Sequence, residues 1–360
     1  MNHPTENVNY RQVNKQEKKV KINRYYVFLL LGLILIGLFI ADLLTGPVRI
    51  VPGDLVRALA GRADQDIRLI LFDFRLPRAL TAVIAGMALS VSGLQMQTVF
   101  QNPLAGPYVL GISSGASLGV AILVLGLSSV ISVNISMAFN SWAIVGAAWL
   151  GSALVLVLIM IVSVRVRDIM TVLILGIMFA SAVSAIVSIM QYFSNESMLK
   201  SFVIWSMGSL GNLSWSQLNI LIISVIIGLT LSVFSTKMLN ALLLGEEHAL
   251  SLGLKVKTAR TLIFISTSIL AGSVTAFCGP LAFIGIAVPH ICRLLFGTSS
   301  HNYLIPGTIL SGGILLLASD IVSQMPGSGK ILPVNSVTAL IGIPVLIWII
   351  IRRNRFMRLS

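Results

Sequence analysis

The sequence predicts an all-α membrane protein with about ten transmembrane helices. Of its 360 residues, 56% are hydrophobic and only 10% are charged, whereas a soluble domain has about 25% charged residues. The apolar residues form long runs, such as 27–40, 143–164 and 331–351, and such runs are typical of membrane spans. Backbone polar groups in lipid must bond within their own segment, so the spans are expected to be helices.

The chain divides into a membrane domain between two basic ends. We expect residues 1–24 to be a disordered cytoplasmic tail, because they are polar and the apolar helix after them is longer than a signal peptide and lacks its cleavage site. Residues 25–351 are expected to form the membrane domain, and residues 352–360 a second cytoplasmic tail. The predicted spans are 25–45, 76–100, 106–126, 142–164, 169–193, 215–236, 260–277, 280–296, 303–323 and 333–351. A helix near 199–210 is too short to cross.

The positions of lysine and arginine predict that both termini are cytoplasmic. These residues are enriched on the cytoplasmic side of membrane proteins, and the two tails hold six and four of them. With ten spans, the inner segments hold 17 and the outer segments 8 of the 25 Lys and Arg residues. The net charge of +13 therefore reflects membrane orientation and attraction to anionic lipid, and does not indicate nucleic-acid binding.

Two stretches of the chain resemble each other, 78–105 and 260–282. Each begins with an arginine, Arg78 or Arg260, continues as a helix rich in small residues, and reaches a Pro-Leu-Ala sequence. Each half of the chain would then contain five spans, and an odd number forces the halves into opposite orientations, as in the inverted repeats of many transporters. The alternative is chance similarity between two helices that are rich in small residues.

Gly86, Ser90 and Gly93 lie on one face of the second predicted span, at spacings of four and three residues. Small residues let helix backbones approach closely, which supplies much of the attraction between helices in lipid. We therefore expect this face to pack against other helices, and the alternative is that it lines a pore.

The sequence lacks motifs for nucleotide binding, metal binding or catalysis. It has no P-loop, so active transport would need energy from a partner chain. Cys278 and Cys292 are expected to be buried thiols, and no metal site is indicated. No span carries paired carboxylates, and the nearest candidates, Asp42 and Asp320, lie near outer span ends. This scarcity argues against a membrane enzyme and against a proton-coupled transporter.

The longest predicted inner loop, 237–259, is amphipathic and carries both acidic and basic residues. Gly245 and Gly253 are expected to break it into short helices. Its composition fits two interpretations equally well: a segment that docks into a groove on a partner, and an ordinary helix on the membrane surface.

This loop, together with seven other motifs in the same order, resembles the FecCD-type permease family. The loop motif reads Leu-Gly-Glu-Glu-His-Ala-Leu-Ser-Leu-Gly over 244–253, and the resemblance extends over about residues 25–351. The other motifs lie at 75–78, 101–107, 110–116, 283–293, 304–307, 318–321 and 332–344.

The resemblance implies the permease subunit of a type II ABC importer. Such a chain is not an enzyme: it forms a homodimer in the inner membrane and binds two cytoplasmic ABC ATPases, on which ATP and magnesium act. A substrate-binding protein delivers the ligand outside, and the ligand, a ferric siderophore, haem or cobalamin, passes from periplasm to cytoplasm. No cofactor or metal is expected on this chain. The alternative function is a stand-alone, ion-coupled secondary transporter.

The resemblance also implies roles for particular residues of this sequence. The segment that couples to the ATPases matches Gly245, Glu246, Glu247, Ala249, Leu252 and Gly253. The cytoplasmic gate matches Asp168, Ile169, Met170 and Thr171.

The resemblance implies that Arg75 and Arg78 dock the binding protein. Arginine suits this role because it can grip a carboxylate at two points. The alternative is that these arginines only anchor the span in lipid headgroups. A third arginine of the vitamin B12 system is replaced here by Gln324, with Lys330 nearby. The replacement argues against close identity with that system.

Overall fold

The computed structural model describes residues 24–48, 50–127, 141–166, 168–211, 213–324 and 331–357. In this part of the chain the regular secondary structure is entirely helical, as predicted. The basic tail up to residue 23 and Lys330 lie outside the described residues, and so do the last three residues. Residues 352–357, which were expected to begin the second tail, continue the last helix to Met357.

Ten helices occupy the ten predicted spans. Seven of the described helices are long and apolar enough to cross a membrane, and three shorter apolar helices, 112–126, 284–296 and 334–347, occupy the other three positions. In chain order, the helices at these positions are α1 (Arg24–Leu44), α4 (Leu76–Val99), α5 (Ile112–Ala121), α8 (Ser141–Arg165), α9 (Ile169–Tyr192), α11 (Trp215–Phe234), α14 (Val256–Cys278), α15 (Ile284–Phe296), α16 (His301–Gln324) and α17 (Val334–Met357).

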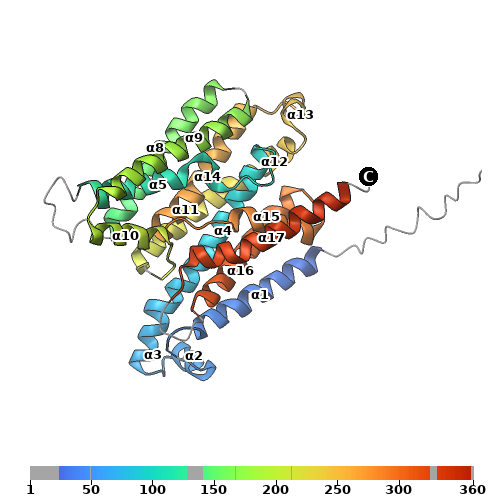
Figure 1. Cartoon of the computed structure of the whole chain (residues 1–360). Helices are drawn as coiled ribbons and strands as arrows, with labels where there is room; N and C mark the ends of the chain where they lie inside the picture. Colours follow the sequence, from blue (N-terminus) through green and yellow to red (C-terminus); the bar gives the residue numbers. More distant parts are fainter. Residues whose placement is uncertain are drawn as a thin grey trace, which may run out of the picture.

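The helices run roughly side by side, and shorter helices mark the two ends of the bundle (Figure 1). One end, called here the α2–α3 end, carries α2 (Pro52–Leu59) and α3 (Gln65–Leu69). The opposite end, the α13 end, carries α12 (Thr236–Leu242) and α13 (Glu246–Ser251). The short helix α10 (Glu196–Ser206) occupies the position of the predicted short helix.

The two most buried helices, α4 and α14, lie at the centre of the bundle. They begin at opposite ends, α4 beside α3 and α14 beside α13 (Figure 1). These are the helices of the two similar sequence stretches, so their opposite directions agree with the predicted inverted repeat.

The small residues of α4 pack against other helices, as predicted, and do not line a pore. A Cβ atom added to Gly93 would lie 1.8 Å from the carbonyl oxygen of Gly285, and one on Gly86 would lie 2.2 Å from that of Gly312. Real Cβ atoms cannot approach so closely, so only glycine permits α15 and α16 to contact α4 along this face.

Two segments differ from the predicted boundaries. The third predicted span begins as an α-helix only at Ile112, because residues 107–110 form a 3-10 turn and Gly111 has a positive φ of 71°. The segment before α4, expected as a connection, is largely helical: α3 continues through the π-helical turn η2 (Ile70–Arg75) into α4. It has a small core of its own, formed by Ile50, Ala58 and Leu71.

Candidate functional site

The segment predicted to couple to ATPases forms α13, which lies between two glycines at the α13 end. Gly245 has a φ of 94° and Gly253 a φ of 80°, values that glycine adopts readily and other residues rarely. The prediction that these glycines break the loop into short helices is confirmed. The result is a six-residue helix, and the chain turns sharply at a glycine before it and at another after it.

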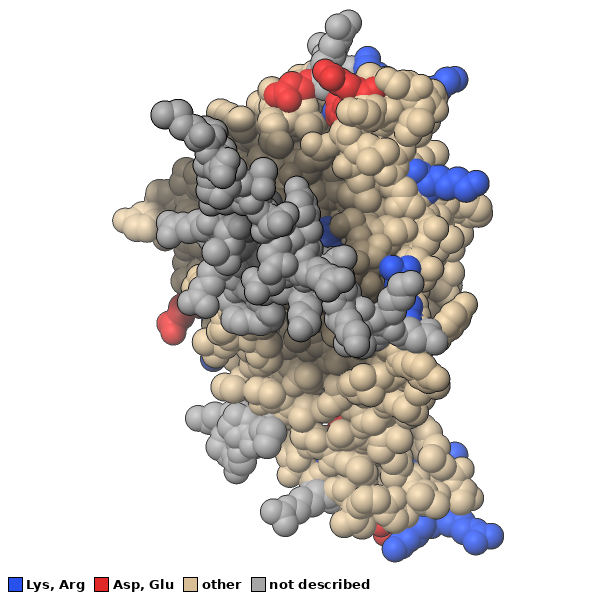
Figure 2. Space-filling view, turned by 90° about the vertical axis from the view of Figure 1, so that its right-hand side faces the viewer, with Lys and Arg blue, Asp and Glu red and all other residues tan. Residues whose placement is uncertain are grey.

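Some of the predicted coupling residues are exposed, and others hold α13 against the rest of the bundle. Glu247 and Leu252 are exposed, Leu252 by 68%. Ala249 is fully buried and holds the helix against the bundle. Figure 2 shows Asp and Glu gathered at the top of the face that it presents, where Figure 1 places α13. The helix therefore offers an acidic and apolar surface, whereas Ala249 cannot contact a partner directly.

Glu246 attaches α13 to the first turns of α14 through an ion pair with Arg260. The side chain of Arg260 is 5% exposed and that of Glu246 is 32% exposed. Burying an arginine is unfavourable unless a carboxylate compensates its charge, so the pair fixes where the start of α13 lies on the bundle. In the sequence, Arg260 was noted only as the start of a repeated stretch, because nothing there indicated that it would be buried beside Glu246.

The residues predicted to form a gate, 168–171, are the beginning of α9 at the same end. The Asp168 carboxylate accepts hydrogen bonds from the backbone N–H groups of Met170 (3.1 Å) and Thr171 (2.9 Å), and from the Thr171 hydroxyl (2.7 Å). These bonds, that of the Thr171 side chain first, lower the pKa of Asp168 below its ordinary value, and the charge of Arg260 lowers it further. Asp168 is thus an ionised N-cap. Ile169 is buried and Met170 is exposed. Gating by this turn stays a prediction.

The two arginines predicted to dock a binding protein are engaged inside the chain. Arg75 is 6% exposed and donates hydrogen bonds to the backbone oxygens of Leu43 (2.8 Å) and Val48. Arg78 grips Asp320 at two points, with Nε to Oδ2 at 2.8 Å and Nη2 to Oδ1 at 2.7 Å. A docking role for either one stays a prediction.

A carboxylate pair that was not predicted lies beside Arg78 at the α2–α3 end. The amide nitrogen of Gln324 donates to Asp42 Oδ1 (3.2 Å) and to Asp320 Oδ2 (2.9 Å), so it bridges the ends of α1 and α16. Both aspartates are buried. The residues are 278 positions apart in the sequence, and only the packing of α1 on α16 brings them together.

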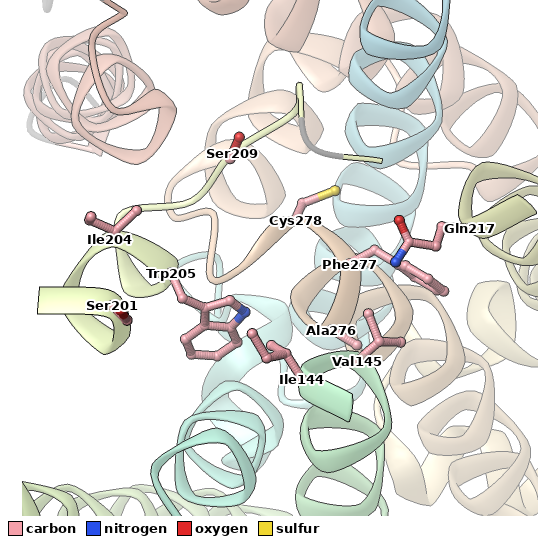
Figure 3. A pocket seen from close by; sticks show the side chains of 10 residues that line it. All are labelled: Ile144, Val145, Ser201, Ile204, Trp205, Ser209, Gln217, Ala276, Phe277 and Cys278. Atoms are coloured by element: carbon pink, nitrogen blue, oxygen red, sulfur yellow. The ribbon is translucent and has the colours of Figure 1, made fainter. Parts of the chain in front are cut away.

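A cavity of about 250 Å³ lies among α8, α10, α11 and α14 (Figure 3). Trp205 and Gln217 face it from opposite sides, with the thiol of Cys278 nearby (Figure 3). The cavity is smaller than the roughly 300 Å³ at the lower end of small-molecule sites, so it does not suit a large chelate. Cys278 and Cys292 are buried, as predicted. In the described part of the chain, no group of three or more His, Cys, Asp or Glu residues could hold a metal ion.

Comparisons with known proteins identify the family. The profile of the FecCD transport family matches residues 33–352. The hemin transport system permease protein HmuU of Yersinia pestis is 35% identical over 286 residues, which cover 79% of this chain and 84% of that protein. The vitamin B12 import system permease protein BtuC of Salmonella typhi is 35% identical over 328 residues, which cover 90% and 94%.

A solved structure described as an inward-facing conformation of a metal-chelate type ABC transporter has the same fold. It superposes with a TM-score of 0.80 at 27% identity and covers 91% of this chain and 99% of that one. The helical fold of the chain and the match to the family profile lead to the same conclusion. The chain is therefore a multi-span membrane permease of the FecCD transport family, a family of ABC importers.

Proposed function

We propose that this chain moves a metal chelate, a ferric siderophore, haem or cobalamin, from the periplasm to the cytoplasm across the inner membrane. The observation that carries the proposal is α13, a short helix between two glycine joints whose exposed surface faces away from the bundle. Such a helix can be moved by a partner without unfolding the membrane domain. ATP and magnesium act on the two partner ATPases, and this chain contributes no nucleotide chemistry.

The α13 end is the cytoplasmic end in this proposal. The start of α1 and the end of α17 both lie there (Figure 1). The basic residues of the first tail directly precede α1 in the sequence, and most of those expected in the second tail lie in the last turns of α17. The excess of Lys and Arg on inner segments supports the same orientation. The α2–α3 end then faces the periplasm, where a binding protein delivers the ligand.

The pathway forms between two copies of the chain. Helix α9 supports this arrangement because most of it is exposed, including the apolar Ile174, Ile177 and Met178. A second copy can cover such a face, and lipid covers what remains. A wall of this composition binds a chelate weakly, so the ligand is not trapped during passage.

Reconstitution into liposomes tests the proposal directly. The chain is purified with the ATPase that co-purifies with it, and uptake of haem, cyanocobalamin and a ferric hydroxamate is measured with and without ATP. Uptake of one of these probes is expected only with both ATPase and ATP. Uptake by the chain alone along an ion gradient would instead support the second candidate, an ion-coupled transporter. The buried carboxylates of Asp42 and Asp320 favour that candidate, because such groups mark ion paths in transporters.

The coupling role of α13 is tested on its exposed residues. Glu247→Arg with Leu252→Asp should weaken co-purification of the ATPase while the chain still reaches the membrane, because both side chains are exposed and make no attachment to the bundle. Glu196→Arg on α10 is the matched control, since it makes the same charge change on an exposed residue of another helix. Equal ATPase recovery from both variants would remove α13 from the interface.

A further inference from the structure

We propose that a groove between the end of α11 and the start of α16 binds one anionic phospholipid, with its phosphate at Lys237 and an acyl chain beside Ile305 and Ile309. The inference goes beyond the proposed function, because binding a lipid requires neither a transported ligand nor an ATPase. Only the assignment of this lipid to the inner leaflet depends on the orientation proposed above.

The groove has a volume of about 670 Å³ and lies at the α13 end of the bundle. This volume falls within the range of roughly 300–1,000 Å³ for sites that hold a small molecule. The last turn of α11 and the first turn of α12 form one wall, and the first turns of α16 form the other. From His301 to Ile309 this second wall extends roughly 12 Å along the helix. The hydrocarbon of one leaflet is roughly 15 Å thick, so an acyl chain can lie along α16.

The groove is polar where α12 and α16 begin and apolar further along α16. Lys237 and Asn302 line its polar part, and both are exposed. Ile305, Pro306 and Ile309 continue the lining along α16. A phospholipid has the same order of groups along the membrane normal, with a charged headgroup at the interface and hydrocarbon below it. The composition of the groove therefore matches a lipid that is seated at the membrane surface.

The charge of Lys237 favours an anionic headgroup. Among the described residues, none that lines the groove is acidic, and Lys237 forms no ion pair. His301 is already engaged, because its Nδ1 lies 3.0 Å from Asn240 Oδ1 and its Nε2 lies 2.9 Å from Thr98 Oγ1. Lys237 is thus the cation that the groove offers to a phosphate. A zwitterionic headgroup carries a positive charge of its own and should gain less from it.

The rim of the groove favours lipid over a second copy of the chain. Val233 and Phe234, in the last turn of α11, are 57% and 72% exposed, and apolar side chains at this depth need an apolar neighbour. A symmetric contact centred on the groove would bring Lys237 of the second copy toward this one, and two like charges repel. An anionic lipid covers the same side chains and neutralises the lysine.

A lipid titration tests the proposal on the full chain without any ATPase. The chain is stripped of lipid in detergent and titrated with phosphatidylglycerol or with phosphatidylcholine that has the same acyl chains. Native mass spectrometry then gives the number of lipids bound to each chain and their affinity. We expect one molecule of phosphatidylglycerol to bind about fivefold more tightly than phosphatidylcholine, the usual contribution of one lysine at an anionic lipid surface.

Two variants separate the headgroup from the acyl chain. Lys237→Gln should lower the affinity for phosphatidylglycerol about fivefold and leave that for phosphatidylcholine unchanged. Lys257→Gln is the matched control, because it makes the same change at an exposed lysine that lies at the same end but outside the groove. Val233→Trp fills the groove from an exposed position and should weaken binding of both lipids. Size-exclusion chromatography before each titration selects folded protein.

Equal affinity of the unaltered chain for the two lipids would overturn the proposal, and so would equal losses in Lys237→Gln and Lys257→Gln. Displacement of phosphatidylglycerol by inorganic phosphate at the same concentration would also overturn it, since the acyl chain would then contribute nothing. Dimers that form through the groove when lipid is removed would assign the groove to a second copy instead. Failure of uptake in liposomes would overturn the proposed function and leave this titration unaffected.

Discussion

Two arginines with little exposure occupy corresponding positions in the two similar stretches of the sequence and lie at opposite ends of the bundle. They are Arg78, whose side chain is 12% exposed, and Arg260, whose side chain is 5% exposed. Each is in the first turns of a central helix, α4 or α14, and each pairs with a carboxylate from elsewhere in the chain. The carboxylates differ. Asp320 is fully buried on α16, a helix of 24 residues, whereas Glu246 is 32% exposed on a helix of six.

From this difference we expect the pair at the α2–α3 end to hold its helices firmly and the pair at the α13 end to allow movement. Asp320 cannot move without α16, and Gln324 ties it to Asp42 on α1. Glu246 can move with α13 because glycines flank that helix. What decides the role is the element that carries the acid, since moving α16 would disrupt many buried residues and moving α13 would disturb one, Ala249.

The largest expected effect comes from breaking the pair at the α2–α3 end. Asp320→Ala leaves Arg78, whose side chain is only 12% exposed, without its counter-charge, which should cost about 3–5 kcal/mol of stability. Thermal unfolding in detergent, followed by size-exclusion chromatography, should show a much lower midpoint and less folded protein. An unchanged midpoint would mean that Arg78 reaches solvent when Asp320 is absent.

Breaking the pair at the α13 end should be milder. Glu246→Ala should cost about 1–2 kcal/mol, because Glu246 is 32% exposed and its removal lets water reach the guanidinium of Arg260, whereas Asp320 is fully buried. The same thermal assay measures it. A loss as large as that of Asp320→Ala would contradict the view that this end is adjustable.

The N-cap of α9 adds a pH dependence to the α13 end. Hydrogen bonds to Asp168 hold its pKa below the ordinary 3.8, so its stabilising effect is fully present above that value and is lost as the pH falls through the lowered pKa. Amide exchange at residues 169–172 should therefore show protection at pH 7 that decreases only under strongly acidic conditions. Asp168→Ala should remove that pH dependence, and a change between pH 5 and 7 would contradict it.

The smallest expected effect is on the surface of the α2–α3 end. Arg57 lies 3.7 Å from Asp54 but its side chain is 67% exposed, and exposed ion pairs contribute little. Arg57→Ala should change stability by less than about 0.5 kcal/mol. It serves as a control for Asp320→Ala, because it breaks an exposed ion pair at the same end of the bundle.

Long apolar helices could be predicted from the sequence within a few residues, as α9, expected at 169–193 and observed at Ile169–Tyr192, illustrates. The break at Gly245 and Gly253 was also predictable, because glycine alone adopts such backbone angles readily. The helical segment before α4 was not, since its polar and charged residues hide the small core around Leu71. The start of α5 was misplaced because a 3-10 turn and an α-helix have similar apolar composition.

In the candidate site, too, some residues could be predicted from the sequence and others could not. Glu246 was predicted by resemblance to the family, but its ion-pair partner, Arg260, was not. Arg75 and Arg78 were expected to face a partner, and both are engaged within the chain. Charge and spacing do not reveal whether an arginine at a span end is exposed, because that depends on helices distant in sequence.

The sequence by itself determined that the chain is a helical membrane protein, where its spans lie and which loop is broken by glycines, because hydropathy and backbone preference act over neighbouring residues. Only the tertiary structure decided which charges meet. The packing of whole helices brings together Arg78 with Asp320, Arg260 with Glu246, and Asp42 with Asp320 through Gln324. The energy of a buried charge depends on what surrounds it in three dimensions, and no local pattern records those surroundings.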